Sequence, residues 1–301
     1  MNQPVPASAA ETAARQIRLG IGLVLFALFM MSWQDGATKI LVRQLPAAQV
    51  VMVRYWAFAV FALVYVSRHG GVVRALRSQR PALQVFRSLL MVGEMTIFAF
   101  AVRWLGLAEM HALFATAPLI GTALAVPVLG ERVGWRRWTG VAIGFLGALV
   151  IIRPGLAVFQ PAGVIALVAA TAWALYGLTT RLASFRDSFE TSMIYMALVG
   201  LVASTAVGLP LWTAPDAQGW ALLGLVSATG ILGHLMLVKA YSFAPASALQ
   251  PFNYSLLIYA VLVGVVLFGD LPDRWTILGA AMIAGSGSYV YWRERRLKRG
   301  K

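Results

Sequence analysis

The sequence predicts an all-α integral membrane protein, with ten transmembrane helices arranged as two inverted five-helix repeats. Three observations support this fold class: the apolar composition, apolar runs of spanning length, and similarity between the two halves of the chain. Of the 301 residues, 60% are hydrophobic and 12% are charged. A soluble domain is nearer half apolar and a quarter charged. The apolar segments are therefore expected to cross a bilayer.

Apolar runs define the expected spans. A spanning helix needs about 20 mostly apolar residues, and the alternating polarity of a transmembrane β-barrel is absent. Small residues at four-residue spacing, such as Gly200, Ser204 and Gly208, are expected to let helices approach closely. The predicted spans are Leu19–Thr38, Ala47–Val66, Phe86–Ala101, Leu107–Pro127, Trp138–Ile152, Gly163–Thr180, Ser188–Leu209, Trp220–Lys239, Ser247–Phe268 and Trp275–Trp292.

Basic residues give the expected orientation. If the N-terminus is cytoplasmic, 18 lysines and arginines fall on the cytoplasmic side and 5 on the opposite side. Loops rich in lysine and arginine stay in the cytoplasm, so both termini are expected there, as a tail over residues 1–18 and a basic tail over 293–301. The charged stretch LGERVGWRRWTG at 129–140 then becomes a cytoplasmic turn. The net charge of +14 follows from the same rule, without a nucleic-acid partner.

The two halves of the chain resemble each other. When the sequence is shifted by 139 residues, Gly130-Glu131 falls on Gly269-Asp270 and Gly140 falls on Gly279. Since five spans per half is an odd number, the halves must cross the membrane in opposite directions. Inverted repeats of this kind are common in secondary transporters, which bind their substrate between the halves near the midplane. The predicted repeats cover residues 19–155 and 156–292.

Two longer strings carry a family resemblance. The segment APLIGTALAVPVLGERVGWRRWTGVAIGFLGALVIIRPG at 117–155 and WALYGLTTRLA at 173–183 resemble the drug/metabolite transporter superfamily and, within it, the EamA family. The pattern is Pro118 in span four, Gly130-Glu131 after it, and glycines in span five. In the second half Asp270 replaces the Glu, and Leu257 stands where Pro118 is. The resemblance, to a bacterial amino-acid exporter among others, implies an inner-membrane exporter that works by alternating access.

Charged residues at membrane depth are costly, so they are candidates for function. Asp35 and Arg54 are expected at similar depth in spans one and two, as an ion pair that is either structural or part of a gate. Glu94 lies near the middle of span three. It is expected either to bind a proton or a substrate amine, or to be a neutral carboxyl bonded to a hydroxyl such as that of Ser88 or Thr96. Protons are therefore a candidate partner.

Aromatic and polar residues supply further candidates for the substrate site. Trp173 and Tyr176 are three residues apart, so they share a helix face and would suit an aromatic or apolar amino-acid side chain. His111 and His234 are weaker candidates, because a lone histidine in a span is more often a packing residue. The last candidates are polar groups beside the bend expected at Pro251 in span nine, where transporters often place their sites: Gln250, Asn253 and Tyr254.

Other classes of function lack support in the sequence. The absence of cysteine excludes disulfides and iron–sulfur clusters, and the three scattered histidines predict no metal site. No cofactor or catalytic residue is predicted, since no nucleophile, base or carboxylate pair converges as an enzyme requires. No GxxxxGK[ST] loop for ATP is present. The expected function is a secondary transporter that exports small metabolites, with amino acids favoured and nucleoside-like compounds or sugars as the alternative.

Overall fold

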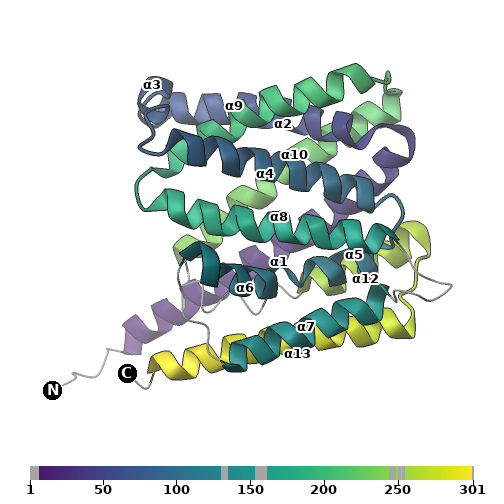
Figure 1. Ribbon diagram of the computed structural model, residues 1–301. Coiled ribbons are helices and arrows are strands. Elements are labelled where there is room, and N and C mark those ends of the chain that lie inside the picture. The colour runs from purple at the N-terminus through teal and green to yellow at the C-terminus, as the bar shows by residue number, and fades with distance from the viewer. Residues whose placement is uncertain are drawn as a thin grey trace.

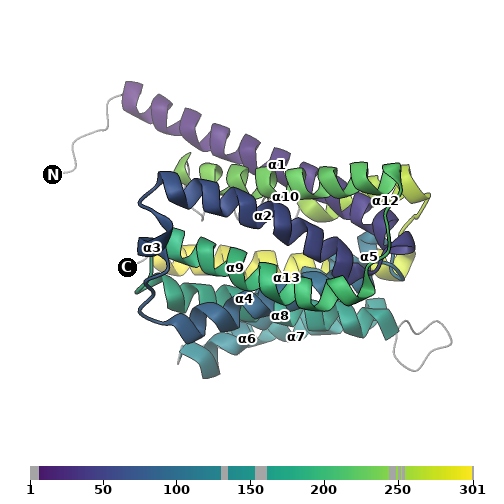
Figure 2. The same ribbon diagram turned by 90° about the horizontal axis from the view of Figure 1, so that it is seen from above.

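Helices running side by side along one direction make up the structure, a computed structural model (Figures 1 and 2). It describes residues 7–129, 135–152, 161–243, 249, 252 and 255–299, and within these ranges every regular element is a helix. Seven helical stretches in this part of the chain are long and apolar enough to cross a membrane, and two shorter apolar helices cover 138–152 and 255–268. The protein is thus a multi-pass membrane protein of the expected class.

All the predicted spans overlap helical segments of the described chain. The helices extend past the apolar residues: α1, with 38 residues, is roughly 57 Å long at about 1.5 Å per residue, whereas the hydrocarbon core is only about 30 Å thick. In chain order the elements are α1 (Ala7–Gln44), α2 (Ala47–Arg68), α3 (Val72–Ala75), α4 (Pro81–Ala101), α5 (Leu107–Phe114), α6 (Ala117–Leu129), α7 (Trp135–Ile152), α8 (Pro161–Ser184), α9 (Phe189–Gly208), the 3₁₀ turn η1 (Leu209–Leu211), α10 (Ala217–Phe243), α12 (Ser255–Phe268) and α13 (Arg274–Arg299).

The fourth predicted span is not one continuous helix. It divides into α5 and α6 around Ala115 and Thr116. Pro118 has no N–H to donate to the carbonyl of Phe114, so the regular ladder cannot continue there. The Thr116 hydroxyl instead donates to the Leu113 carbonyl at 2.6 Å, which satisfies one of the carbonyls at the end of α5. Because the helix is interrupted, α5 and α6 are separate helices, and the side chains of α5 need not continue the helical faces of α6.

Small residues set the distance between α2 and α9, as expected from their spacing. Gly200, Ser204 and Gly208 are all buried, and α9 packs along α2. A Cβ at Gly200 would overlap the ring of Tyr55, and one at Gly208 would lie 2.8 Å from the Ala48 carbonyl oxygen. The two backbones can therefore be this close only because these positions lack side chains.

Four helix pairs hold the bundle together: α1 with α10, α4 with α8, α2 with α9, and α7 with α13. In Figure 1 the α7–α13 pair lies along one side of the bundle and the α2–α9 pair along the opposite side. Figure 2 shows α1 beside α10. Each pair joins a helix from before residue 153 to one from after residue 160, so the two halves of the chain are interleaved rather than packed as separate domains.

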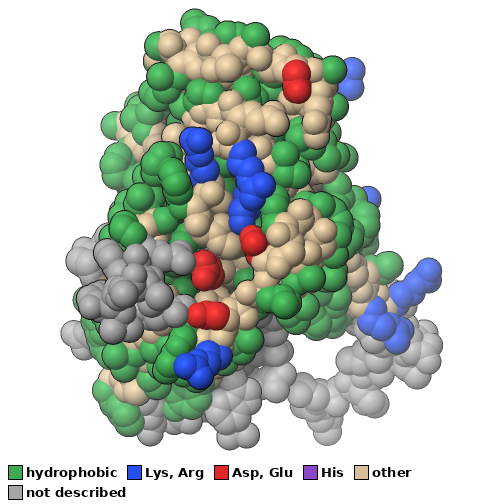
Figure 3. Space-filling model, turned by 90° about the vertical axis from the view of Figure 1, so that its right-hand side faces the viewer, with side chains coloured by type: hydrophobic (Ala, Val, Ile, Leu, Met, Phe, Trp, Pro, Cys, Tyr) green, Lys and Arg blue, Asp and Glu red, His purple; other side chains and the backbone are tan. Residues whose placement is uncertain are grey.

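The bundle has two distinct ends, which we name by their short helices. At the α3 end, α2 ends and α4 begins, and both the start of α1 and the end of α13 lie there (Figure 1). At the opposite α5 end, Lys39 Nζ lies 2.8 Å from Asp270 Oδ2 and 4.7 Å from the centre of the Phe268 ring. Figure 3 views this end and shows basic and acidic side chains gathered between apolar surroundings.

The α2–α9 contact leads to a prediction about stability. Replacing Gly208 with Leu should lower the free energy of unfolding by roughly 1–3 kcal/mol, because the new side chain would meet backbone that cannot move aside. Thermal unfolding in detergent measures the loss. The matched control is Gly224→Leu on α10, where a Cβ meets nothing within 4 Å. Equal stability of the two variants would show that the α2–α9 distance does not depend on Gly208.

Candidate functional site

A polar cluster lies inside the bundle, where α1 faces α5. His111 of α5 is buried, and its Nε2 atom lies 3.1 Å from Oδ2 of Asp35 on α1. The two groups are close enough for an ion pair, but they are not aligned for a hydrogen bond, and Nε2 has no other partner in the described part of the protein. His111 is therefore held beside a carboxylate with its hydrogen-bonding capacity unused.

Asp35 pairs with His111 rather than with Arg54, so the expected Asp35–Arg54 ion pair is wrong. Among the described residues, no carboxylate lies within 4.0 Å of the Arg54 guanidinium. Arg54 instead reaches toward Gln34 and α10, where a Cβ at Gly230 would lie 3.4 Å from Arg54 Nη2. It still interacts electrostatically with Asp35 and Glu94. The guanidinium therefore faces two carboxylates without a direct contact to either.

Glu94 is a buried carboxyl on α4, with 4% of its surface exposed. The hydroxyls that could have neutralised it are used elsewhere: Ser88 donates to the Gln84 carbonyl and Thr96 donates to the Val92 carbonyl. Across the described residues, Glu94 has no hydrogen bond and no ion pair within 4.0 Å. Buried polar groups are usually bonded, so this carboxyl is available to a ligand or a proton.

A continuous aromatic wall adjoins the polar cluster. We define it as Phe98 of α4, Phe114 of α5, and Trp173 and Tyr176 of α8. Neighbouring ring centres are 5.5 Å apart from Phe98 to Phe114, 5.9 Å from Phe114 to Trp173, and 5.7 Å from Trp173 to Tyr176. The Phe98 ring also lies 5.8 Å from that of His111. The wall and the polar cluster of Asp35, Arg54, Glu94 and His111 together form what we call the central site.

The structure brings six of the predicted site residues together: Asp35, Arg54, Glu94, His111, Trp173 and Tyr176. His234 is an exposed residue on α10, where its Nδ1 contacts the Gly230 carbonyl of its own helix at 2.8 Å. Gln250, Asn253 and Tyr254 lie outside the described residues. Phe98 and Phe114 were not predicted. The spacing of Phe98 four residues after Glu94 on one helix face is the signal that could have identified it.

A second polar group, which the sequence did not predict, occupies the α3 end. Arg87 of α4, near the start of the predicted span Phe86–Ala101, is buried, with 2% exposure. Its guanidinium donates to Gln84 Oε1 at 2.9 Å, to the Ser192 carbonyl at 3.0 Å and to Thr180 Oγ1 at 3.3 Å. It also lies 5.4 Å from the centre of the Tyr176 ring. These neutral partners and the ring allow the charge to be buried.

Asp187, in the turn between α8 and α9, is the acid of this group. It accepts hydrogen bonds from Gln84 Nε2 and from the backbone N–H of Gln79, both at 2.8 Å, and from the Ser78 hydroxyl. Partial burial raises the pKa of Asp187, but these hydrogen bonds outweigh it and hold the pKa below its ordinary value. We call Ser78, Gln79, Gln84, Arg87, Thr180, Asp187 and Ser192 the α3-end network.

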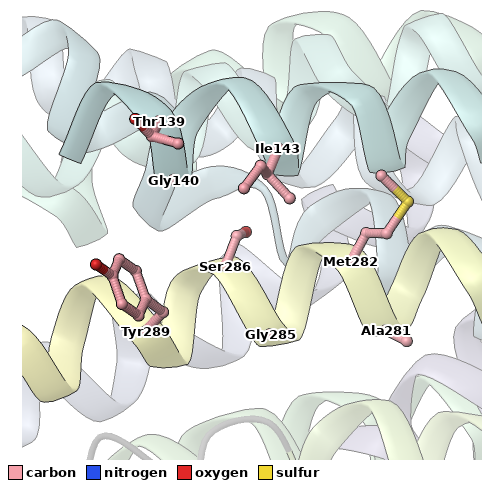
Figure 4. A pocket seen from close by; sticks show the side chains of 8 residues that line it. All are labelled: Thr139, Gly140, Ile143, Ala281, Met282, Gly285, Ser286 and Tyr289. Carbon is pink, nitrogen blue, oxygen red and sulfur yellow. The ribbon is translucent and has the colours of Figure 1, made fainter. Parts of the chain in front are cut away.

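Surface hollows lie away from the central site. A groove of about 300 Å³ runs between α7 and α13, and its lining is uncharged (Figure 4). A pocket of about 540 Å³ lies at the α3 end beside Asp187. In the described part of the chain, no three histidine or acidic side chains are placed to hold a metal ion. The groove is lined by Thr139, Gly140, Ile143, Ala281, Met282, Gly285, Ser286 and Tyr289.

Known proteins resemble this chain over nearly its full length. The model of the EamA-like transporter family matches residues 18–153 and again 160–291. An S-adenosylmethionine uptake transporter of Rickettsia felis is 27% identical over 92% of this chain and 94% of its own. A riboflavin transporter of Vibrio cholerae is 31% identical, covering 85% and 86%. A pseudopaline exporter of Pseudomonas aeruginosa is 24% identical, covering 89% and 94%.

One solved structure, described only as the crystal structure of a protein, has a similar fold. It superposes with a TM-score of 0.62, covering 94% of this chain and 99% of the other, at 16% sequence identity. At this identity the likeness concerns the fold alone. It agrees with the helical bundle described above.

The α3-end network leads to a prediction about pH. Asp187→Asn should lower thermal stability at neutral pH. Because the folded pKa of Asp187 is depressed, its contribution is present above the unfolded value of about 3.9 and is lost as the pH falls through the folded value. Unfolding curves of both proteins in detergent from neutral to acidic pH should therefore converge on the acid side. A difference that stays constant over this range would contradict a role for the ionised carboxylate.

Proposed function

Since the chain belongs to the EamA-like transporter family, we propose that it is a secondary transporter of small metabolites in the bacterial inner membrane, and that the central site binds the substrate. One observation carries the proposal: Glu94, a buried carboxyl without a hydrogen bond in the described residues, lies one helical turn before Phe98, where a continuous aromatic wall begins. A buried polar group of this kind is costly unless a ligand or proton satisfies it. The bilayer and a small-molecule substrate are the partners that this role requires.

We further propose that ten spans form two inverted repeats, with both termini in the cytoplasm. The two separate matches to one family model support this division. Helix contacts support it too. In two repeats, α1 would correspond to α8, α2 to α9, α4 to α10 and α7 to α13. Replacing each helix by its counterpart turns the α1–α10 contact into the α8–α4 contact, and it leaves the α2–α9 and α7–α13 contacts unchanged, so the observed contacts have the symmetry that two repeats require. The α3 end would then be the cytoplasmic end.

Aromatic or apolar amino acids are the substrates that we favour. Glu94 and Asp35 offer two carboxylates for an ammonium group, Arg54 offers a guanidinium for a carboxylate, and the rings of Trp173 and Phe114 offer flat surfaces for a side chain. Apolar walls with a few polar groups that orient the ligand are typical of small-molecule sites. We take export as the direction to be tested, as in the name of the pseudopaline relative, with uptake, as in the names of the S-adenosylmethionine relatives, as the alternative. Transport by alternating access serves either direction.

Nucleoside-like compounds that carry an amino-acid group are the second candidate. S-adenosylmethionine, named for several relatives, joins an adenine ring to an ammonium and a carboxylate. The same polar groups and the same wall would serve both candidates. Transport into proteoliposomes of each compound, loaded from either side, would distinguish them and give the direction of transport.

The aromatic wall predicts the effect of one substitution on affinity. Trp173→Leu should weaken the binding of tryptophan by roughly 2- to 10-fold, the loss expected for one aromatic contact. Uptake of radiolabelled tryptophan into proteoliposomes gives the change in KM. Trp220→Leu is the control, since Trp220 is exposed at the start of α10, away from the wall. Equal effects of the two substitutions would remove Trp173 from the site.

Glu94 is the candidate for proton coupling. Glu94→Gln keeps the shape of the side chain but cannot ionise, so it should abolish the stimulation of transport by a pH gradient across the liposome membrane. The control is Glu109→Gln at the start of α5, where the carboxyl accepts from the Gly106 N–H. If the Glu94→Gln variant keeps the full response to the gradient, Glu94 has no part in coupling.

A further inference from the structure

The α3-end network joins parts of the chain that are far apart in sequence. On one side are Ser78, Gln79, Gln84 and Arg87, which precede or begin α4. On the other are Thr180, Asp187 and Ser192, around the turn from α8 to α9, about 100 residues later. In the proposed architecture these belong to the first and second repeat. The network therefore ties the two halves together at one end of the bundle.

The network also contacts the aromatic wall through a single side chain. The Arg87 guanidinium packs against the Tyr176 ring and donates to Gln84 Oε1. The amide of Gln84 in turn donates to Asp187. A chain of direct contacts thus runs from the wall through Arg87 and Gln84 to the turn between α8 and α9.

The opposite end has a comparable contact between the halves. Lys39, with 4% exposure, lies on α1 of the first half, and its partner Asp270 lies in the turn before α13 of the second half. Each end thus has a buried basic residue of the first half and an acidic residue in a turn of the second half. Arg87 is linked to Asp187 through Gln84, and Lys39 contacts Asp270 directly. Alternating access requires that the bundle open at one end at a time.

We propose that the α3-end network is the lock that closes this end of the bundle, and that Arg87 is the positioning residue that ties the lock to the aromatic wall. The ion pair of Lys39 and Asp270 is its counterpart at the α5 end. The lock deepens the proposed function, because it assigns a gate to the transport cycle, but it can be tested without any substrate.

Two matched reporters can be built because the chain has no cysteine. Ser88→Cys is fully buried beside Arg87, and Thr38→Cys is buried beside Lys39. Both hydroxyls donate to the carbonyl four residues earlier in their own helix, so each replacement removes one local hydrogen bond of the same kind. The labelling rate with a water-soluble maleimide in liposomes then reports the opening of each end.

Asp187→Ala should raise labelling of the Ser88→Cys reporter by about tenfold or more, as expected when a hydrogen bond to a charged group is lost. Labelling of the Thr38→Cys reporter should not rise. Asp270→Asn should have the reverse effect on the two reporters. If Asp187→Ala raises both rates equally, or raises neither, the network is no lock.

Further substitutions test the contact that joins the α3-end network to the aromatic wall through Arg87. Arg87→Lys should raise labelling of the Ser88→Cys reporter, and its effect should not add to that of Asp187→Ala, because both break one chain of contacts. Tyr176→Leu should raise the rate as well, whereas Trp173→Leu, a neighbour without contact to Arg87, should not. Additive effects, or equal effects of the two aromatic substitutions, would overturn the link. An unchanged labelling rate of the Thr38→Cys reporter in each variant excludes general loosening.

Discussion

The cost of placing charge inside a bilayer is the constraint on which the rest of this structure depends. A buried ion must be satisfied within the bundle, because lipid offers no hydrogen bonds. Arg87 meets this requirement with three neutral acceptors and a ring, and Lys39 meets it with Asp270. Each solution includes a partner from the other half of the chain: Thr180 and Ser192 for Arg87, and Asp270 for Lys39. Satisfying these charges therefore also determines how the halves meet.

Glu94 and His111 are different, because their capacity is left unused. A protein that needed them only for stability could replace them with apolar residues of similar size at little cost. Their position beside the aromatic wall gives a physical reason to retain them. The bundle thus contains two kinds of buried polar group. Arg87 and Lys39 are hydrogen-bonded and connect the halves at its ends, whereas the Glu94 carboxyl and His111 Nε2 make no hydrogen bond in the described residues and lie near the aromatic wall.

Local sequence patterns predicted the features that are set within a single helix. Features that depend on contacts between distant parts of the chain could not be predicted in this way. The spans follow from apolar runs, the contact of Trp173 with Tyr176 from three-residue spacing, and the close approach at Gly208 from small residues four apart. The pairing of Asp35 with His111 instead of Arg54 depends on how α1 and α5 meet, which neither helix reveals by itself. The burial of Arg87 depends on α8 and α9, which its own helix does not reveal.

The distribution of contact types between the halves suits a protein that must open at alternate ends. Polar contacts such as those of Asp187 lie at the water-facing ends, where water can replace a lost partner and the net free-energy cost is small. Close packing such as that of Gly200 against Tyr55 of α2 lies along the helices, where separation would lose van der Waals contacts. Motion is therefore least costly as rocking about the packed helix pairs, with the ends opening and the central site staying between them.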